Sequence, residues 1–233
     1  MKFHKTIGIV GGAGPVASAF LYNTILEVCQ KQYKANDYKD FPEIILVSYP
    51  FTRGDKERIR KEISLCESKL KQAGASFWCI ASNTFHGFLP EIDLPFVNLI
   101  FEGLRVAGNA GVTKALILAA QGTIDLKLYE GSSILCVYPS LEDQRLIHQI
   151  VREVAGGHTH ERQAGIIKGV IDHYDVDGVI LACTEIPIIH RSFPLNLSIS
   201  MPIIDTIEVL AEKLVDLSID PLKKTPPGEE AQQ

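Results

Sequence analysis

Two short polar segments, each placed directly after an apolar run, contain residue types suited to acid–base chemistry and to binding small anions. They are WCIASNTFH, with Ser82, Asn83 and Thr84, and GVILACTE, with Cys183, Thr184 and Glu185. Apolar runs that end in small hydrogen-bonding residues are typical of parallel strands at their carboxyl edge, where open α/β sheets bind ligands. The pattern predicts that both segments face a ligand.

Cys183 is the cysteine best suited to chemistry, because it ends a strand and is the counterpart of Ser82 in the other segment. A thiol has a pKa of about 8.5 and becomes a better base where helix N-terminal N–H groups lower that value. The other cysteines lie in apolar runs or predicted helices and are interpreted as inert; they are Cys29, Cys66, Cys79 and Cys136. The odd total of five cysteines and their wide spacing predict neither disulfides nor a zinc knuckle, and favour a cytoplasmic protein.

A glycine-rich turn follows the first predicted strand. GIVGGAGPVA contains Gly12-x-Gly14-x-x-Ala17, which is the outline of a dinucleotide fingerprint. The second predicted strand, EIILVSYP, ends without the carboxylate that would hold a ribose, so nicotinamide or flavin binding is disfavoured. Two other interpretations stay open: a tight strand-to-helix connection, and a loop whose backbone N–H groups approach a small carboxylate.

Two loop segments carry further polar side chains. Arg53 follows the second predicted strand, where a guanidinium can bind a carboxylate through two hydrogen bonds, although a solvated arginine beside Asp55 is the simpler interpretation. His158 and His160, followed by Glu161, lie in a glycine-rich connection without a third ligand at a recognisable spacing. The histidine segment is therefore predicted to be a surface loop and not a metal site.

Composition and charge limit the kinds of partner. The 233 residues are 46% hydrophobic and 22% charged, which is ordinary for a globular protein with a sizeable core. The net charge of −5 and the scattered Lys and Arg residues argue against nucleic acid or an anionic membrane as a partner. No apolar run approaches the length of a membrane span.

Short apolar runs alternate with longer amphipathic ones, a pattern typical of βα units and a parallel sheet. Strands are predicted at 6–11, 43–49, 76–81, 95–99, 114–119, 133–138, 178–182 and 202–205. Helical periodicity is present at about 16–34, 55–73, 101–110, 124–130, 142–155, 160–174 and 206–218. The sequence thus predicts an α/β protein.

The chain also contains a weak internal repeat. IGIVGGAGP opens the first half much as ALILAAQGT opens the second, and Ser82 and Cys183 end strands at equivalent points of the two halves. We infer two similar flavodoxin-like α/β domains related by pseudo-two-fold symmetry, with a site where their strand ends face each other. The predicted divisions are 1–101, 102–205, a helix at 206–220 that packs back on the first domain, and a disordered tail at 221–233.

Together these segments resemble the cofactor-independent aspartate/glutamate racemases. GIVGGAGP is similar to that family's opening glycine turn, IASNTFH to its first catalytic C-N-T-x-H segment, AAQGT to its middle turn and LACTE to its second catalytic cysteine motif. The order and spacing of these motifs agree from about residue 6 to residue 215. Glutamate racemases of cell-wall synthesis typically have a D-S-G turn and a C-T-H motif, so this chain resembles the aspartate racemase branch more closely.

The resemblance implies roles for individual residues. Cys183 would move the α-proton on one face of Cα, and no cofactor would be needed. The α-carboxylate would be bound by Asn83, Thr84, Thr123 and Thr184, the side-chain carboxylate by Arg53, and Gly12 and Glu185 would also lie at the substrate. In some relatives a lysine of the second domain helps to hold the distal carboxylate, but the corresponding stretch here, VREVAGGHTHE, has no lysine.

Ser82 departs from the family, whose members usually have cysteine at this position. Racemisation without pyridoxal phosphate needs an acid and a base on opposite faces of Cα, and a hydroxyl is too weak an acid to become a ready base at neutral pH. Three explanations stay open. Some relatives have a hydroxyl residue here and work best from one enantiomer; the serine is an engineered substitution; or the protein has left racemase chemistry and uses only Cys183.

The hypothesis from the sequence is a racemase of L-aspartate or L-glutamate, with Cys183 and Ser82 on opposite faces of Cα. The rivals are a non-catalytic protein that binds acidic metabolites, a related decarboxylase or isomerase that uses only Cys183, and a Rossmann oxidoreductase. The expected partner is a small amino-acid substrate, and the resemblance alone implies a homodimer.

Overall fold

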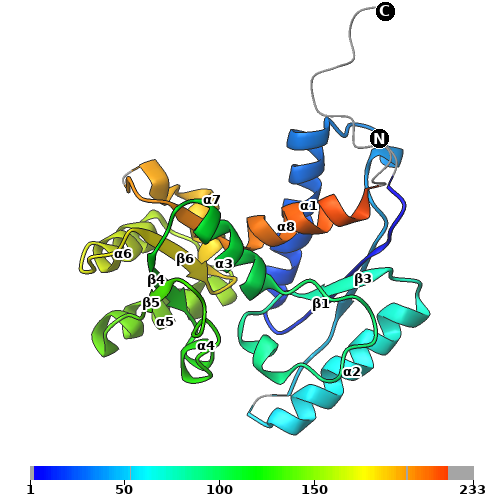
Figure 1. Cartoon of the computed structure of the whole chain (residues 1–233), viewed down its shortest axis with the longest axis horizontal. Coiled ribbons are helices and arrows are strands. Elements are labelled where there is room, and N and C mark those ends of the chain that lie inside the picture. Colours follow the sequence, from blue (N-terminus) through cyan, green and yellow to red (C-terminus); the bar gives the residue numbers. More distant parts are fainter. Residues whose placement is uncertain (1–2, 53, 198, 220–233) are drawn as a thin grey trace, which may run out of the picture.

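Two parallel β-sheets form the framework of the computed structural model, which describes residues 3–52, 54–197 and 199–219 (Figure 1). Arg53 and the predicted tail at 221–233 therefore lie outside the described residues. The first sheet has the order β2 (Ile44–Ser48), β1 (Ile7–Gly11), β3 (Phe77–Ile80), and the second has the order β5 (Leu135–Val137), β4 (Lys114–Ala119), β6 (Gly178–Ala182), β7 (Ile203–Asp205). The predicted α/β fold with two parallel sheets is confirmed.

Helices connect the strands and cover both sheets. They are α1 (Pro15–Tyr33), α2 (Lys56–Gln72), α3 (Leu99–Asn109), α4 (Gln121–Asp125), α5 (Leu141–Ala155), α6 (Glu161–Ile171), α7 (Ile186–Ser192) and α8 (Thr206–Ser218). Short 3₁₀ helices lie at η1 (Tyr38–Asp40), η2 (Thr84–Phe88) and η3 (Leu195–Leu197). Side chains at the helix starts satisfy N–H groups that have no partner within the helix: Asp55, Asn98, Ser140 and Asp205 cap α2, α3, α5 and α8. Within the part of the chain that the structure describes, none of the helices combines the length and apolar character of a membrane span.

Alternation along the strands explains why the sheets are apolar on both faces. In β1, Ile7 and Ile9 belong to the core shared with α1 and α8, whereas Val10 belongs to the cluster that includes residues of α2. In β4, Leu116 and Leu118 pack with residues of α5 and α6, whereas Ala115, Ile117 and Ala119 pack toward the shared core. The central strands β1 and β4 therefore carry apolar side chains on both sides, as buried parallel strands do.

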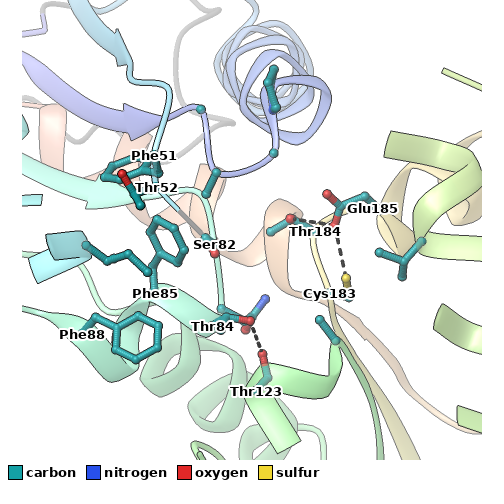
Figure 2. Close-up of a pocket in the computed structure, with 18 of the residues that line it drawn as sticks. Phe51, Thr52, Ser82, Thr84, Phe85, Phe88, Thr123, Cys183, Thr184 and Glu185 are labelled. Carbon is teal, nitrogen blue, oxygen red and sulfur yellow. Dashed lines mark hydrogen bonds between the residues drawn. The ribbon is translucent and has the colours of Figure 1, made fainter. Parts of the chain in front are cut away.

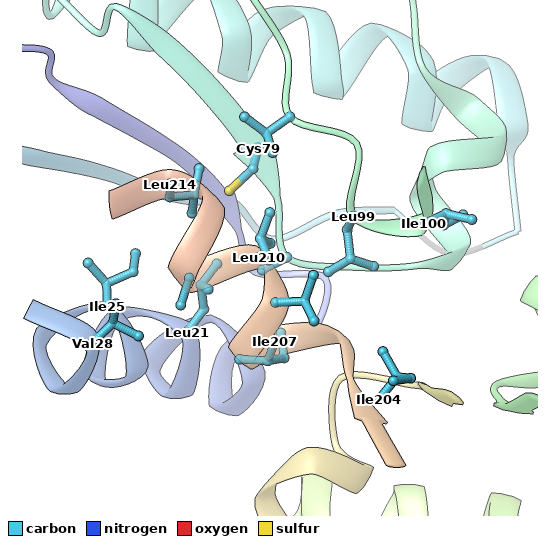
Figure 3. Packing of buried hydrophobic residues seen from close by; sticks show 14 of the residues in the cluster. Leu21, Ile25, Val28, Cys79, Leu99, Ile100, Ile204, Ile207, Leu210 and Leu214 are labelled. Atoms are coloured by element: carbon cyan, nitrogen blue, oxygen red, sulfur yellow. The ribbon is translucent and has the colours of Figure 1, made fainter. Parts of the chain in front are cut away.

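The last helix joins the two halves of the chain. After β7 in the second sheet, α8 runs back and packs against α1 and α3 (Figure 3). Leu210 and Leu214 of α8 lie among Leu21 and Ile25 of α1 in one buried cluster, which also contains Cys79 of β3. Each of these leucines is fully buried, so the contact contributes on the order of 2 kcal/mol per side chain to keeping the two sheets in place.

Three segments differ from the sequence-based prediction. The stretch 95–99, predicted as a strand, forms only an isolated parallel bridge between Phe96 and Trp78, because Asn98 already caps α3. The helix predicted at 124–130 ends at Asp125 and is followed by a left-handed residue, Lys127. The prediction omitted α7, which has a proline in its first turn, a position that proline favours.

His86 ties the end of β3 to the start of α3. Its Nδ1 lies 2.8 Å from the carbonyl oxygen of Ser82, and the N–H of Leu99 donates to its Nε2 at 3.2 Å. Because Nε2 accepts, Nδ1 carries the proton and donates to Ser82. Desolvation of the ring lowers the pKa of His86 to about 4, so the side chain is neutral at pH 7.

We expect the free energy of unfolding to fall as the pH decreases from 6.5 toward 4, and to fall less in His86→Gln. The unfolded chain protonates this histidine near its ordinary pKa of 6.5, whereas the folded protein keeps it neutral down to about 4. The stabilisation is thus complete above the unfolded pKa and is lost as the pH approaches the folded one, amounting to roughly 2–3 kcal/mol. Urea unfolding at several pH values measures this difference.

The variant is compared with the wild type because burial raises the pKa of Asp205 to about 6, which acts in the opposite sense over the same range. That contribution is common to both proteins and cancels in the difference. Parallel stability curves for the two proteins would contradict the assignment.

Candidate active site

A cavity of about 760 Å³ lies between the carboxyl ends of the two sheets (Figure 2). Residues that follow β1, β3, β4 and β6 line it, together with the loop between β2 and α2 and one side chain of α5. The structure brings together every predicted site residue that it describes: Gly12, Ser82, Asn83, Thr84, Thr123, Cys183, Thr184 and Glu185. Arg53 lies outside the described residues, and the individual roles stay predictions.

Cys183 and Glu185 form a hydrogen-bonded pair at the end of β6. The thiol donates to Glu185 Oε2 at 3.1 Å, and the hydroxyl of Thr184 donates to the same oxygen at 3.1 Å. Burial raises the pKa of Cys183 well above its usual value, and the charge of Glu185 and its hydrogen bond to the thiol raise it further. Cys183 is therefore a thiol and not a thiolate at pH 7.

Ser82 lies on the wall that the first half of the chain provides. It follows β3, whereas Cys183 follows β6 of the other sheet, and Figure 2 shows the two on different sides of the cavity. The backbone of Ser82 is fixed by the bond from His86 to its carbonyl oxygen. The side chain of Ser82 is thus presented to the cavity by a strand end with a defined position.

Asn83 is oriented by a tyrosine from the other half of the chain. The hydroxyl of Tyr129, which is fully buried, donates to Asn83 Oδ1 at 2.6 Å. Burial raises the pKa of Tyr129 well above its usual value, so the phenol keeps its proton and remains a donor. The opposite end of the amide, Nδ2, is buried and has no hydrogen-bond partner among the described residues. Nδ2 is therefore an unpaired donor on a residue that lines the cavity.

Thr84 and Thr123 extend this donor group across the boundary between the halves. Their hydroxyl oxygens lie 2.9 Å apart, and either one can be the donor (Figure 2). Since one hydroxyl uses its proton in this bond, the other keeps a proton for a ligand. Nδ2 of Asn83 and the threonine pair are thus neutral hydrogen-bond donors on residues that line the cavity.

One side of the cavity is aromatic (Figure 2). Phe51 and Phe85 make an edge-to-face contact with ring centroids 4.8 Å apart, and Phe88 lies beside Phe85 at 6.2 Å. The loop that carries Phe51 is held by Thr52, whose backbone N–H and hydroxyl both donate to the carboxylate of Glu62. These N–H and O–H donors lower the pKa of Glu62.

The glycine turn after β1 has a structural role in the backbone. Gly12 has a φ of +99°, and a side chain there would collide with the backbone of Tyr49. Its N–H donates to Ser18 Oγ at 3.1 Å, and that hydroxyl donates to the carbonyl of Gly14. The N–H of Gly12 is therefore already bonded, which favours the interpretation of this segment as a tight turn over that of a carboxylate cradle.

Metal-binding residues do not gather anywhere in the described part of the chain: no group of three or more His, Cys, Asp or Glu side chains has a suitable arrangement. His158 and His160 lie in the exposed connection between α5 and α6, as the sequence predicts.

Several residues at or beside the site were not predicted from the sequence. Tyr129 had no signal, because its partner Asn83 is 46 residues away and no motif links them. Phe85 and Phe88 lie three residues apart on η2 directly after the predicted S-N-T segment, and this spacing was the available signal for an apolar wall. Lys56, at the start of α2, also lines the cavity and was not predicted.

The fold and the cavity define a class of α/β protein. In this class the carboxyl ends of two parallel β-sheets enclose a site with a thiol on one side and a hydroxyl on the other. Comparison with known families makes the class specific. The chain belongs to the Asp/Glu/hydantoin racemase family, whose model matches residues 10–214. The predicted family resemblance is thereby confirmed, and membership supports an amino-acid racemase activity.

Individual relatives agree with this family. The broad specificity amino-acid racemase RacX of Bacillus subtilis is 24% identical over 226 residues, covering 90% of this chain and 96% of RacX. An aspartate racemase homologue from Pyrococcus horikoshii has 25% identity and a TM-score of 0.76, with 92% of this chain and 99% of that chain covered. Aspartate racemase from Picrophilus torridus shares the fold, with a TM-score of 0.74, 24% identity, and 92% of this chain and 94% of that chain covered.

We predict that Tyr129→Phe lowers both stability and ligand affinity. Without the phenol donor, Asn83 Oδ1 is left buried and unpaired, which costs about 1–2 kcal/mol, and the amide is free to rotate Nδ2 away from the ligand. Urea unfolding measures the first effect, and calorimetry with L-aspartate measures the second as an expected loss of at least about threefold.

Tyr138→Phe is the matched control. The hydroxyl of Tyr138 is also buried but has no hydrogen-bond partner among the described residues, so its removal should leave stability unchanged or raise it. If Tyr129→Phe bound aspartate as well as the wild type while losing stability, the orienting role would be wrong and Tyr129 would be a purely structural residue.

Proposed function

We propose that this protein racemises a free amino acid, aspartate or glutamate, by proton transfer at both faces of Cα and without pyridoxal phosphate. The single observation that carries the proposal is the placement of Cys183 and Ser82: they follow strands of different sheets and line the same cavity. Racemisation requires that one group removes the α-proton while another supplies a proton from behind, and two facing strand ends provide this geometry.

In the proposed reaction the α-carboxylate is bound by Asn83 Nδ2 and the threonine pair, which holds Cα between the two walls. The Cys183 thiolate removes the α-proton of the L-enantiomer and becomes a thiol. Hydrogen bonds from the amide and the hydroxyl groups stabilise the negative charge that develops on the carboxylate. A proton supplied from the Ser82 side then completes inversion, and exchange with solvent restores the protonation states of both groups.

The different acidities of Cys183 and Ser82 imply a preferred direction of the proposed reaction. A thiol is a far stronger acid than an aliphatic hydroxyl, so Cys183 abstracts a proton more readily than Ser82 does. The L-enantiomer, with its α-proton toward Cys183, is the preferred substrate in this proposal. Of the explanations for the serine, this one retains racemase chemistry in a natural protein.

Lys56 supports the proposal that the substrate has an acidic side chain. Among the described residues that line the cavity, it is the basic one. Arg53 is proposed as a second partner for that carboxylate on the basis of the family resemblance. The phenyl rings of Phe51, Phe85 and Phe88 favour a different substrate for the same reaction, an amino acid with an apolar side chain. A panel of both enantiomers of acidic and apolar amino acids decides between them.

A homodimer and a cytoplasmic location are also proposed. The location is supported by the five cysteines, none of which forms a disulfide. The homodimer rests on the family resemblance.

The first test is exchange of the α-proton with solvent deuterium. Wild-type protein in D₂O should incorporate deuterium at Cα of L-aspartate or L-glutamate, and Cys183→Ala should reduce the rate by about 10²-fold or more, which is the usual contribution of a positioned acid or base. NMR spectroscopy of the Cα proton follows the reaction. Exchange that persists in Cys183→Ala would refute the role of Cys183, whereas aspartate binding without exchange in the wild type would identify a binding protein.

The second test introduces a thiol at position 82, on the side of the cavity opposite Cys183. Ser82→Cys should raise the turnover of the D-enantiomer by about 10-fold or more, because a thiol replaces a hydroxyl as the group that must take its α-proton. Polarimetry with both enantiomers measures the change, and turnover from the L-enantiomer is the internal reference. An unchanged rate from the D-enantiomer would show that the missing thiol is not what limits this direction.

A further inference from the structure

The two oxygens of the Glu185 carboxylate have different surroundings. Oε2 accepts hydrogen bonds from Cys183 and Thr184, both at 3.1 Å. Oε1 accepts none from the described residues, and it lies beside Gly14, at the start of α1 on the other side of the boundary between the halves. Glu185 is 9% exposed and lines the cavity (Figure 2). A carboxylate in this position keeps one strong acceptor free for a ligand.

We propose that Oε1 of Glu185 binds the α-ammonium group of the substrate, so that the site selects free α-amino acids over ligands without that group, such as 2-hydroxy acids, hydantoins and malonates. This inference rests on the proposed function, because it takes Cα to lie between Cys183 and Ser82. It adds a role for Glu185 and a chemical class that the family alone does not decide.

Gly14 supports the assignment from the opposite wall. Its backbone is extended, with φ of −136°, so its conformation does not require glycine. A Cβ at this position would lie 2.7 Å from Oε1 of Glu185, which is closer than such atoms approach. A side chain at residue 14 would therefore push Oε1 of Glu185 from its present position.

The charges along the cavity agree with this orientation of the substrate. Glu185 is the one acidic side chain among the described lining residues, whereas Asn83 and the threonine pair offer neutral hydrogen-bond donors. An α-amino acid has one positive and one negative group on the same carbon. The ammonium group at Glu185 and the carboxylate at Asn83 give Cα two fixed attachments, and the side chain then extends toward the aromatic part of the cavity.

Ammonium binding at Glu185 also supplies a reason for Cys183 to ionise when substrate is present. The charge of Glu185 is one of the causes of the raised pKa of Cys183, after burial. An ammonium group bound to the carboxylate offsets that charge and lowers the pKa of the thiol, which then releases its proton to solvent and becomes a thiolate while Glu185 stays charged. The titratable side chains that interact electrostatically with the thiol are Glu185 and Tyr129. Tyr129 remains a neutral phenol, so Glu185 is the charged one.

The test compares ligands that differ only at the α-substituent. Calorimetry is performed with L-aspartate and L-malate, and with L-phenylalanine and L-phenyllactate, on wild type, Glu185→Gln and the control Glu161→Gln. Glu161 lies at the exposed start of α6 and its replacement makes the same change in net charge. Glu185→Gln should weaken amino-acid binding by about 10- to 100-fold and leave hydroxy-acid binding unchanged or slightly tighter, since a negative charge is removed. Glu161→Gln should bind all ligands like the wild type.

Equal losses for the amino acid and its hydroxy analogue would overturn the proposal and assign Glu185 a structural role. A wild type that binds amino acids no better than their hydroxy analogues would overturn it as well. If Glu185→Gln does not fold, Gly14→Ala tests the same point, because its Cβ displaces Oε1 while the charge is retained; here too only amino-acid binding should fall.

Failure of the proposed function gives a different result. Amino-acid binding that depends on Glu185, without exchange of the α-proton in D₂O, would support the ammonium site and refute the racemase. Exchange in the wild type with no selective effect of Glu185→Gln would do the reverse.

Discussion

The packing of α8 against α1 and α3 is the constraint on which the site depends. Both sheets contribute to one apolar cluster through this contact, with Ile9 of β1 and Ile117 of β4 as members of the same core as Leu210 of α8. Two parallel sheets have their ligand-binding edges at their carboxyl ends, but two such edges form a single cavity only if the sheets are held with those ends facing. Here an apolar interface remote from the chemistry holds them so.

Polar contacts between the halves occur both away from the cavity, where Arg191 of α7 pairs with Glu27 of α1, and at the cavity itself. Three close approaches lie at the cavity. Tyr129 bonds Asn83, Thr84 bonds Thr123, and Glu185 approaches Gly14. Each joins a residue of one half to a residue of the other, and each involves a group proposed to hold substrate. The two kinds of contact have different roles. Burial of apolar surface is not directional and fixes how the two sheets are arranged. Hydrogen bonds are directional and orient single functional groups within that arrangement.

The parts of this structure that sequence could predict are those set by local pattern. Apolar runs that end in Ser82 and Cys183 predicted strand ends with functional groups, because the periodicity and the chemistry are read from neighbouring residues. Tyr129 could not be predicted, since its role depends on a contact with Asn83 that only the assembled fold creates. Glu185 was predicted to lie at the substrate, but its position beside Gly14 could not be, because two segments far apart in the chain meet there. Asn98 shows a local failure: its cap on α3 cut short an apolar run that otherwise resembles a strand.

An amino-acid racemase of this kind must reconcile a buried thiol with the need for a base. Burial excludes water from the carbanion, yet the same burial raises the pKa of Cys183 and favours its protonated form. A permanent positive charge beside the thiol would solve this at the cost of repelling the substrate ammonium. A carboxylate does the opposite: Glu185 attracts the ammonium, and the arriving positive charge then favours the thiolate. In the proposed mechanism the base is therefore generated by the substrate, and the thiol stays inert until a ligand with an α-ammonium group occupies the cavity.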